Sequence, residues 1–489
     1  QYQCMKARAL KENILRKLGR VKEAEELHKE SLKIDPLYDR QPEKINHNTL
    51  LELVIDLYEA GDYAQGITLA EKWVEQQNVS RQEDIYPLVY YYIAYGYQNL
   101  HRKENTEQAN CYMTMYVTLG ENAAADGCFP HRTEDYIVLK SLAEEYHLAM
   151  AYYYLGCLLY DRRVYDESIE DYEESILRSP DFPTVHRNLA LAYYNVKKLP
   201  QRAYEEMEKA FALDETDARV YLELDQLKKR LNVAVKERWS DMEKHFDLVE
   251  SRDDLYLEYV TLLNTLGEPE KALGLIKARK FHQWEGGEGK VAAQYLTALY
   301  QLAKAAVEKE DYAEAKELLL RAVGEYPHNL GEGKLESGQE NNLYYLLGLV
   351  QEKLGEAKDA FESLTRACCG ESEPVGMMYY NDQPPEMIYY QGLAYRMLGE
   401  EEQAVSRFQK LVDYGREHIR DDVKIDYFAV SLPDLLIFEE NLNERNRKHC
   451  LFMMSLGLKG LGRIDEAEKC AEELLAVDNA HQEIRVHDL

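Results

Sequence analysis

The stretch at residues 342–367, NLYYLLGLVQEKLGEAKDAFESLTRA, decides how the rest of this sequence is interpreted. Its apolar residues recur at helical spacing on both sides of Gly355, which predicts two amphipathic helices joined by a tight turn. Leu347 and Gly348 lie on the apolar face of the first helix, and Ala360 lies on that of the second. One such pair cannot bury both of its apolar faces. We therefore expect it to stack on similar neighbours.

Copies of this unit recur along the chain, with a turn followed by an alanine in the second helix. The clearest turns and alanines are Gly19 and Ala24, Gly61 and Ala70, Gly267 and Ala272, Gly355 and Ala360, Gly399 and Ala404, and Gly462 and Ala467. A period of about 34 residues with Leu-Gly, an aromatic residue, an alanine and a proline at fixed offsets is the tetratricopeptide signature. Over nearly its whole length the chain resembles the tetratricopeptide-repeat superfamily. The resemblance implies an all-α superhelix, a solenoid of roughly ten or eleven helix-turn-helix repeats.

The repeat pattern is interrupted in two places. Residues 120–131 contain Gly127 and Pro130, which predict a loop, and the irregular part extends to about residue 148. Residues 217–250 keep two helices but lose the small residues of the repeat. We therefore expect an N-terminal array at 1–250 with an irregular insertion near 120–148, and a C-terminal array at 251–489.

The composition limits the possible partners. The chain has 89 acidic against 59 basic residues, a formal net charge of -30. This balance argues against nucleic acid or an anionic membrane as the partner, because phosphate-binding surfaces need clustered Lys and Arg. A basic partner stays open, and so does the alternative that the acidity serves solubility. The eight cysteines form no C-x-x-C pair, so we expect reduced thiols, no metal site and no cofactor.

The second half of the chain has a closer resemblance. Four strings, at residues 281–290, 329–342, 379–386 and 426–436, are similar to those of large bacterial proteins in which such repeats follow an uncharacterised β-rich domain. The resemblance implies a bacterial, cytoplasmic protein with a role in carbohydrate metabolism. Because the chain begins at Gln1, inside a predicted helix, we also expect a region that precedes it.

These four strings, which we call the rim loops, share one position in the repeat. Each follows the second helix of one unit and precedes the first helix of the next, so stacking should align them along one edge of the solenoid. A surface of this kind fits a protein partner or the preceding domain, and it also has the carboxylates and aromatic rings of a sugar site. Alternatively the loops only brace the array, with Glu332 and Glu340 capping helices or pairing with Lys290 and Lys334. The candidate rim residues are Trp284, Glu285, Glu288, Glu340, Tyr380, Asn381, Asp382 and Tyr427.

A second candidate surface is the concave groove lined by the first helices of the repeats. The fifth position of the repeat gives a largely aromatic stripe there, which suits an extended peptide or a glycan. The alternative is that tyrosine is the ordinary packing residue of this chain, which has 39 tyrosines and 10 phenylalanines. The candidate groove residues are Tyr153, Arg187, Tyr300, Tyr345 and Tyr389.

The sequence therefore predicts a non-catalytic scaffold that binds a protein, a peptide or its own preceding domain. The alternative is an accessory region of a carbohydrate-active enzyme, in which the rim loops complete a sugar site on a β-rich domain. No residue pattern supports a nucleophile elbow or a phosphate loop, and no catalytic residue is assigned.

Overall fold

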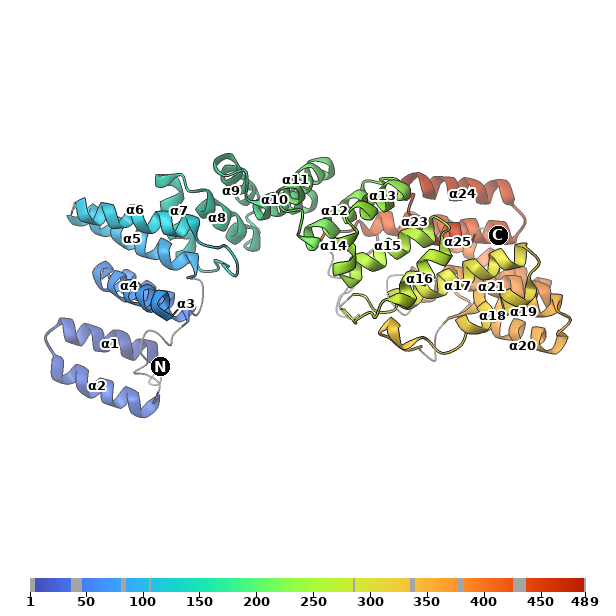
Figure 1. Cartoon of the computed structure of the whole chain (residues 1–489), viewed down its shortest axis with the longest axis horizontal. Helices are drawn as coiled ribbons and strands as arrows, with labels where there is room; N and C mark the ends of the chain where they lie inside the picture. Colours follow the sequence, from blue (N-terminus) through green and yellow to red (C-terminus); the bar gives the residue numbers. More distant parts are fainter. Residues whose placement is uncertain are drawn as a thin grey trace. The chain divides into compact units, whose positions relative to one another are not determined.

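In the computed structural model the described residues are 5–36, 46–80, 85–104, 107–284, 286–334, 339–376, 382–424 and 437–487. Within these ranges all regular secondary structure is helical (Figure 1). This confirms the predicted all-α fold class. None of the described helices is both long and apolar enough to cross a membrane.

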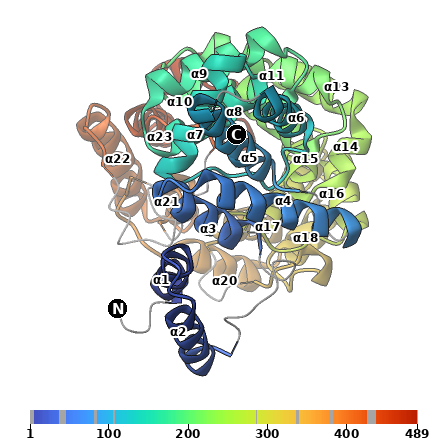
Figure 2. The same cartoon turned by 90° about the vertical axis from the view of Figure 1, so that its left-hand side faces the viewer.

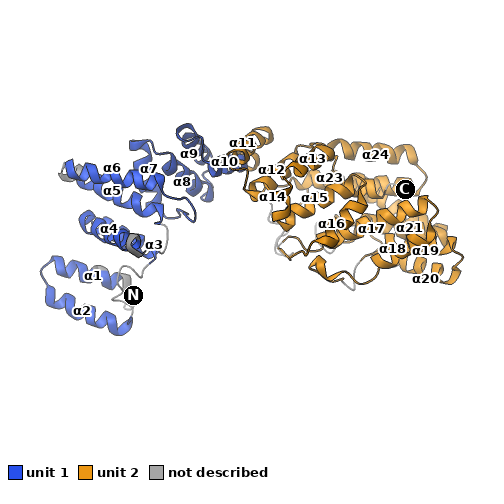
Figure 3. Cartoon of the chain, viewed as in Figure 1, with its two compact units in different colours: residues 1–192 blue, residues 193–489 orange. Residues whose placement is uncertain are grey.

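The chain divides into two compact units, residues 1–192 and 193–489 (Figure 3). The first ten helices are α1 (Met5–Lys17), α2 (Val21–Ile34), α3 (His47–Glu59), α4 (Tyr63–Ser80), α5 (Pro87–Glu104), α6 (Glu107–Asn122), α7 (Thr133–Tyr146), α8 (Ala149–Asp161), α9 (Tyr165–Arg178) and α10 (Pro183–Asn195), in which the division falls.

The described residues of the second unit also form helices. Its elements are α11 (Pro200–Leu213), α12 (Ala218–Arg230), α13 (Val235–Lys244), α14 (Phe246–Ser251), α15 (Asp253–Thr265), α16 (Pro269–Ala278), α17 (Lys290–Glu308), α18 (Tyr312–Ala322), the 3-10 helix η2 (His328–Leu330), α19 (Asn341–Lys353), α20 (Ala357–Ala367), α21 (Pro385–Met397), α22 (Glu401–His418), α23 (Leu442–Gly460), α24 (Ile464–Val477) and α25 (Gln482–Val486).

The template unit forms α19 and α20, with the predicted turn between them. Gly355 has φ 78°, a backbone conformation that suits glycine. A Cβ at Gly348 would lie 2.7 Å from Cγ of Leu364, so the two helices cross where Gly348 leaves room. Ala360 and Leu364 are buried, as predicted. Local sequence and packing therefore agree in this unit.

Some repeats make the same turn without glycine. Arg163, Lys198, Asn232 and Glu310 have φ between 55° and 62°. Backbone in this region costs a residue with a Cβ about 1 kcal/mol. These turns are imposed by the packing of the two helices rather than favoured by the local sequence.

The predicted interruption near residue 120 is a loop between α6 and α7. The buried Asp135 carboxylate accepts the backbone N–H groups of His131 and Arg132 and, at 2.7 Å, the hydroxyl of Tyr92. The Phe129 N–H donates to the Tyr86 hydroxyl. These hydrogen bonds hold the loop against α5 of the first unit.

The division at residue 192 differs from the expected one at residue 250. The irregular copy at residues 217–250 belongs with the helices that follow it, because of a buried ion-pair network. Arg238 of α13 is 1% exposed and donates to the carboxylates of Asp225 on α12 and Glu258 on α15, at 2.6 and 2.7 Å. Breaking this network would leave a buried charge unpaired, so α12, α13 and α15 are held as one body.

Within the second unit, residues near its C-terminal end form hydrogen bonds with residues of its first helices. Asn195 donates to the carbonyl of Ile437 at 2.9 Å, and Arg230 donates to the carbonyl of Phe438 at 3.0 Å. The N–H of Asn479 donates to the side chain of Asn232 at 2.7 Å. Helices of this unit follow one another around a ring (Figure 2). The unit is therefore closed upon itself by hydrogen bonds.

Candidate functional site

Several helices of the second unit hold residues 481–487, which we call the C-terminal segment. It contains the five-residue helix α25. Side chains of α15, α17 and α21 contact the segment, and Phe452 of α23 packs against His481 with ring centroids 5.1 Å apart. We call this side of α15, α17 and α21 the inner face. The candidate site consists of the inner face and the segment that occupies it.

A cluster of amides holds the beginning of the C-terminal segment. Gln294 of α17 donates to Gln482 at 2.9 Å, and Gln482 donates back to Gln294 at 3.2 Å. Gln482 also donates to the carbonyl of Thr261 and the hydroxyl of Thr265, both at 3.2 Å. Asn264 donates to the Gln294 side chain at 2.9 Å. Because these amides are buried, each hydrogen bond replaces one that water would otherwise make.

A lysine holds the backbone at the end of the segment. The Lys304 ammonium of α17 donates to the carbonyl of Val486 at 2.9 Å. This hydrogen bond recognises the main chain and not the side chain. Between Gln482 and this carbonyl, the side chains of Ile484 and Val486 are buried.

Two tyrosine hydroxyls form a chain of hydrogen bonds to His487, the last described residue. The hydroxyls of Tyr300 and Tyr390 are 2.6 Å apart, and the Tyr390 hydroxyl lies 3.0 Å from Nδ1 of His487. Burial, and the nearby Lys304 ammonium after it, lowers the pKa of His487 to about 3. The imidazole is therefore neutral at neutral pH, so its Nδ1 can accept a hydrogen bond from Tyr390.

A buried carboxyl group lies near the same segment. Burial, together with the Glu483 carboxylate, raises the pKa of Glu386 on α21 to about 8. At neutral pH the Glu386 side chain is thus largely protonated, which limits its repulsion of Glu483.

The predicted groove residues of the second unit lie near this site but not as an exposed stripe. Tyr300 is 1% exposed, and its ring centroid lies 5.6 Å from that of His487. Tyr389 is 3% exposed and packs on Phe408. Tyr345 is half-buried, with its ring centroid 5.5 Å from that of Tyr390. Tyr300 is covered by the C-terminal segment and Tyr389 by its packing on Phe408, so neither is exposed, and their part in binding stays a prediction.

The two groove residues of the first unit also do not form an exposed stripe. Tyr153 is 8% exposed and packs edge-on against Phe182, with ring centroids 4.9 Å apart. Arg187 is half-buried and donates to the side chain of Asn188 at 3.2 Å. In this unit the tyrosine is a packing residue, which is the alternative that the composition left open.

Sequence reasoning missed the residues that contact the segment most directly. On the inner face these are Gln294, Lys304 and Tyr390, and the segment residues that they contact are Gln482, Val486 and His487. A signal was present in part, because amide side chains are unusual on the apolar face of a repeat helix. The contact between α25 and the inner face joins residues about 90 to 220 positions apart, which periodicity cannot reveal.

The structure brings two of the four rim loops together. The N–H of Phe281 donates to the carbonyl of Asn329 at 2.9 Å. The Glu332 carboxylate accepts the N–H groups of Gly289 and Ala292 at 2.7 and 2.9 Å, at the beginning of α17. Glu332 therefore caps a helix, the alternative that the sequence left open for it.

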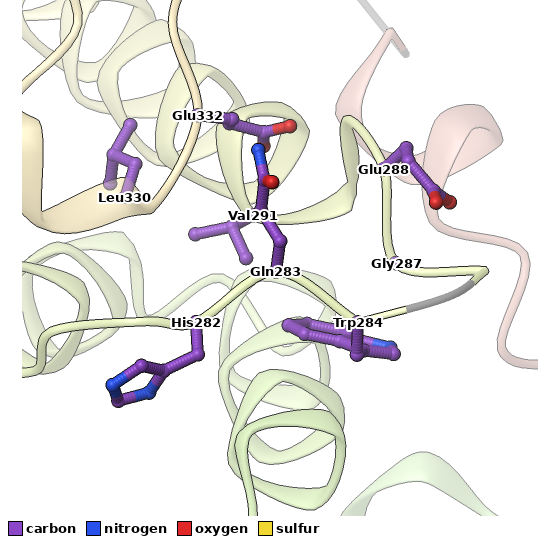
Figure 4. A pocket seen from close by; sticks show the side chains of 8 residues that line it. All are labelled: His282, Gln283, Trp284, Gly287, Glu288, Val291, Leu330 and Glu332. Carbon is purple, nitrogen blue, oxygen red and sulfur yellow. The ribbon is translucent and has the colours of Figure 1, made fainter.

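A small open pocket lies between these two loops, and Figure 4 shows its lining. Trp284 is half-buried against Gly287, where its ring leaves no room for a Cβ, and Glu288 is exposed. The pocket is lined by His282, Gln283, Trp284, Gly287, Glu288, Val291, Leu330 and Glu332.

The other described rim residues, Glu340 and Asp382, do not line this pocket. Glu340 is buried and forms an ion pair with Lys334 at 2.8 Å. Asp382 is half-buried in the loop before α21. Glu285, Tyr380, Asn381 and Tyr427 lie outside the described residues. Among the described residues, no group of three His, Cys, Asp or Glu could hold a metal ion, and the seven described cysteines form no disulfide.

Comparison with protein families identifies the repeats. Residues 153–218 and 300–374 match one family model described as tetratricopeptide repeat, and residues 386–414 match a second one. The chain therefore carries tetratricopeptide repeats in both units. The matched regions include α19 and α20, the unit from which the sequence was interpreted.

Solved structures of similar proteins include yeast Tom70, at 11% identity and a TM-score of 0.31 over 98% of this chain and 93% of that one. They also include the TPR domain of P58(IPK), at 10% identity and a TM-score of 0.24 over 96% and 98% of the two chains. YrrB, described as a TPR protein with an unusual peptide-binding site, has 15% identity and a TM-score of 0.18 over 47% and 90%. Similarity at this level says nothing about what this chain binds.

Proposed function

We propose that this chain, which carries tetratricopeptide repeats, is a non-catalytic scaffold that binds a peptide segment of a protein partner on the inner face of its second unit. Stacked repeats of this kind commonly provide extended concave binding surfaces. A cytoplasmic location, expected from the resemblance and from reduced cysteines, belongs to the same proposal.

The observation that carries the proposal is the hydrogen bond from Lys304 to the carbonyl of Val486 beside the amide pair of Gln294 and Gln482. Recognition of a peptide requires contacts of both kinds. Main-chain contacts contribute affinity, and side-chain contacts contribute sequence specificity. The inner face thus already holds one peptide segment, that of the chain itself.

The rim loops give less support to the alternative of a sugar site. A glycosidase needs two carboxyl groups free to face the sugar, one as acid and one as base or nucleophile. Glu332 is engaged at the beginning of α17 and Glu340 is paired with Lys334. Trp284 and Glu288 line the pocket, where a partner can contact them. Of the described loop carboxylates, Glu332 and Glu340 brace the array.

A selection from a displayed peptide library on the full chain tests the proposed function. We expect enriched peptides whose binding, measured by titration calorimetry on a chain cleaved after Asn479 and freed of residues 480–489, falls at least tenfold in Lys304→Met. The matched control is Lys309→Met, an exposed lysine just after the same helix, which should bind as the unchanged chain does. Failure to enrich any peptide, or equal loss in both variants, would contradict a peptide site on the inner face.

A further inference from the structure

The C-terminal segment is too short to hold a helical conformation by itself. α25 has five residues, whereas isolated helices shorter than about 12 residues are marginal in water. Its conformation is therefore held by the inner face.

The contacts of the segment differ in kind from those between repeats. Neighbouring repeats pack through small and apolar residues, as at Gly348 and Leu364. The segment is held by buried polar groups instead: the amide of Gln482, the carbonyl of Val486 and the imidazole of His487. Buried polar contacts discriminate strongly, because a sequence that lacks the partner group leaves a donor or acceptor unpaired.

These contacts define a sequence pattern. Gln482 provides the amide, Ile484 and Val486 provide buried apolar side chains two and four positions later, and His487 follows at the fifth. The hydrogen bond from Lys304 is independent of side chain. A peptide with this pattern would satisfy the same groups.

We propose that the C-terminal segment occupies the inner face in cis as a displaceable ligand, and that a partner peptide with this pattern replaces it. The inference rests on the proposed function, to which it adds the partner's chemistry and its regulation. Asn479 is held by Asn232, next to the segment, so the segment is tethered close to its site. A tether of this kind gives the bound segment an effective concentration in the millimolar range, so a free peptide must outcompete it.

A cut chain tests this proposal. A protease recognition sequence is inserted between Asn479 and Ala480 of the full chain, which is cleaved after folding. A fluorescent peptide of residues 480–489, AHQEIRVHDL, is then added in excess. Binding is measured by fluorescence anisotropy. We expect the dissociation constant of the peptide to be at least tenfold lower for the cut chain than for the uncut chain. A peptide with the Gln482→Ala and His487→Ala substitutions should bind the cut chain at least tenfold more weakly.

The outcomes separate this inference from the proposed function. Equal binding by cut and uncut chains would overturn the competition in cis while leaving a peptide site in place. A cut chain that keeps its own segment for a day would show a fixed part of the fold and would also overturn it. Enriched library peptides unrelated to the pattern would contradict the inferred partner chemistry but not the proposed function. An uncut chain that forms a dimer and exchanges segments between its copies would show that the segment of a second copy occupies the inner face. That result would overturn occupation in cis.

If cleavage unfolds the protein, amide hydrogen exchange on the uncut chain tests whether the segment can be displaced. Displacement requires that the N–H groups of α25 exchange at least 100-fold faster than those of the buried centre of α23, because the segment must leave without global unfolding. Exchange of both helices at the same rate would overturn the proposal.

Discussion

The side-chain amides of Gln294 and Gln482 bond to each other in both directions across 188 positions of sequence. Their pairing connects the middle of the second unit to the C-terminal segment. Removing one partner leaves one buried atom of the other amide, the Gln482 oxygen or the Gln294 nitrogen, without its hydrogen bond, which costs about 1–3 kcal/mol. The pair therefore provides the most direct measure of how strongly the segment is held.

The first prediction concerns this pair. Gln294→Ala and Gln482→Ala should each lower the free energy of unfolding of the second unit by about 2 kcal/mol, and the double variant by less than the sum. In a Trp73→Phe background the remaining tryptophans, Trp239 and Trp284, both report on this unit during urea unfolding. Strict additivity of the two effects would contradict the reciprocal hydrogen bonds.

The second prediction concerns the pH dependence of His487. Its pKa is lowered from 6.5 to about 3, so below pH 6.5 the unfolded chain binds a proton that the folded chain does not. Stability should therefore fall as the pH is lowered from 6.5 towards 3, by about 2 kcal/mol between pH 7 and pH 5.

Several groups face His487, namely Lys304 of α17, His481 of the segment itself, and the hydroxyls of Tyr300 and Tyr390. His487→Gln keeps an acceptor but does not titrate. The difference between its urea unfolding curves at pH 7 and pH 5 and those of the unchanged chain isolates the imidazole. Parallel pH profiles in the two proteins would contradict a buried neutral histidine.

The third prediction has the opposite sign. Burial and Glu483 raise the pKa of Glu386 from 4.5 to about 8, so between these values the folded chain holds a proton that the unfolded chain releases. The contribution of this proton to stability is present at low pH and is lost as the pH rises to 8. Glu386→Gln should stabilise by about 3 kcal/mol at pH 7, with no gain below pH 4.5.

Glu402→Gln is the matched control for this change, because Glu402 is exposed on the next helix, α22. It should alter the melting temperature little at any pH. An equal response of the two variants to pH would exclude burial of Glu386 as the cause.

The fourth prediction concerns the turn between α17 and α18. Glu310 has φ 57°, which glycine adopts at lower cost. Glu310→Gly should therefore raise the free energy of unfolding by up to about 1 kcal/mol. The matched substitution Glu308→Gly, in the last turn of α17, should lower it by about 1 kcal/mol. Thermal melting distinguishes the two signs, and a loss of stability at both positions would contradict the strained turn.

The fifth prediction tests the register of the template unit. Gly348→Leu should destabilise the second unit by at least about 2 kcal/mol, because the new side chain would meet Leu364 across the helix crossing. Gly274 lies in α16 with open space at its Cβ position, so Gly274→Ala should be neutral or stabilising. If Gly348→Leu melts as the unchanged chain does, the assigned crossing is wrong.

The sequence was sufficient for the helical units, because each unit is a local pattern. The turn at Gly355 and the close crossing at Gly348 follow from residues less than 25 positions apart. The loop before α7 was also predictable from its glycine and proline. The repeat family, too, could be identified from the turns and alanines, and the family comparisons support it at 153–218, 300–374 and 386–414.

The occupied inner face could not be predicted, because it depends on long-range contacts. Position counting found Tyr300 but selected Tyr389, whereas the neighbouring Tyr390 contacts His487. A helix rotates by about 100° per residue, so an error of one position turns the side chain from the inner face to the next helix. The buried Arg238 network, which joins α12 and α13 to α15, is likewise not visible in the repeat pattern.

The hydrogen bonds that join Asn232 to Asn479 and Arg230 to Phe438 have a consequence for how the second unit unfolds. An open array of repeats behaves as a linear chain of neighbours and can fray from either end. Here the terminal repeats are each other's neighbours, so fraying at one end removes contacts from the other. The second unit should therefore lose its structure in one cooperative transition, and its folding should wait for the slow meeting of residues more than 200 positions apart.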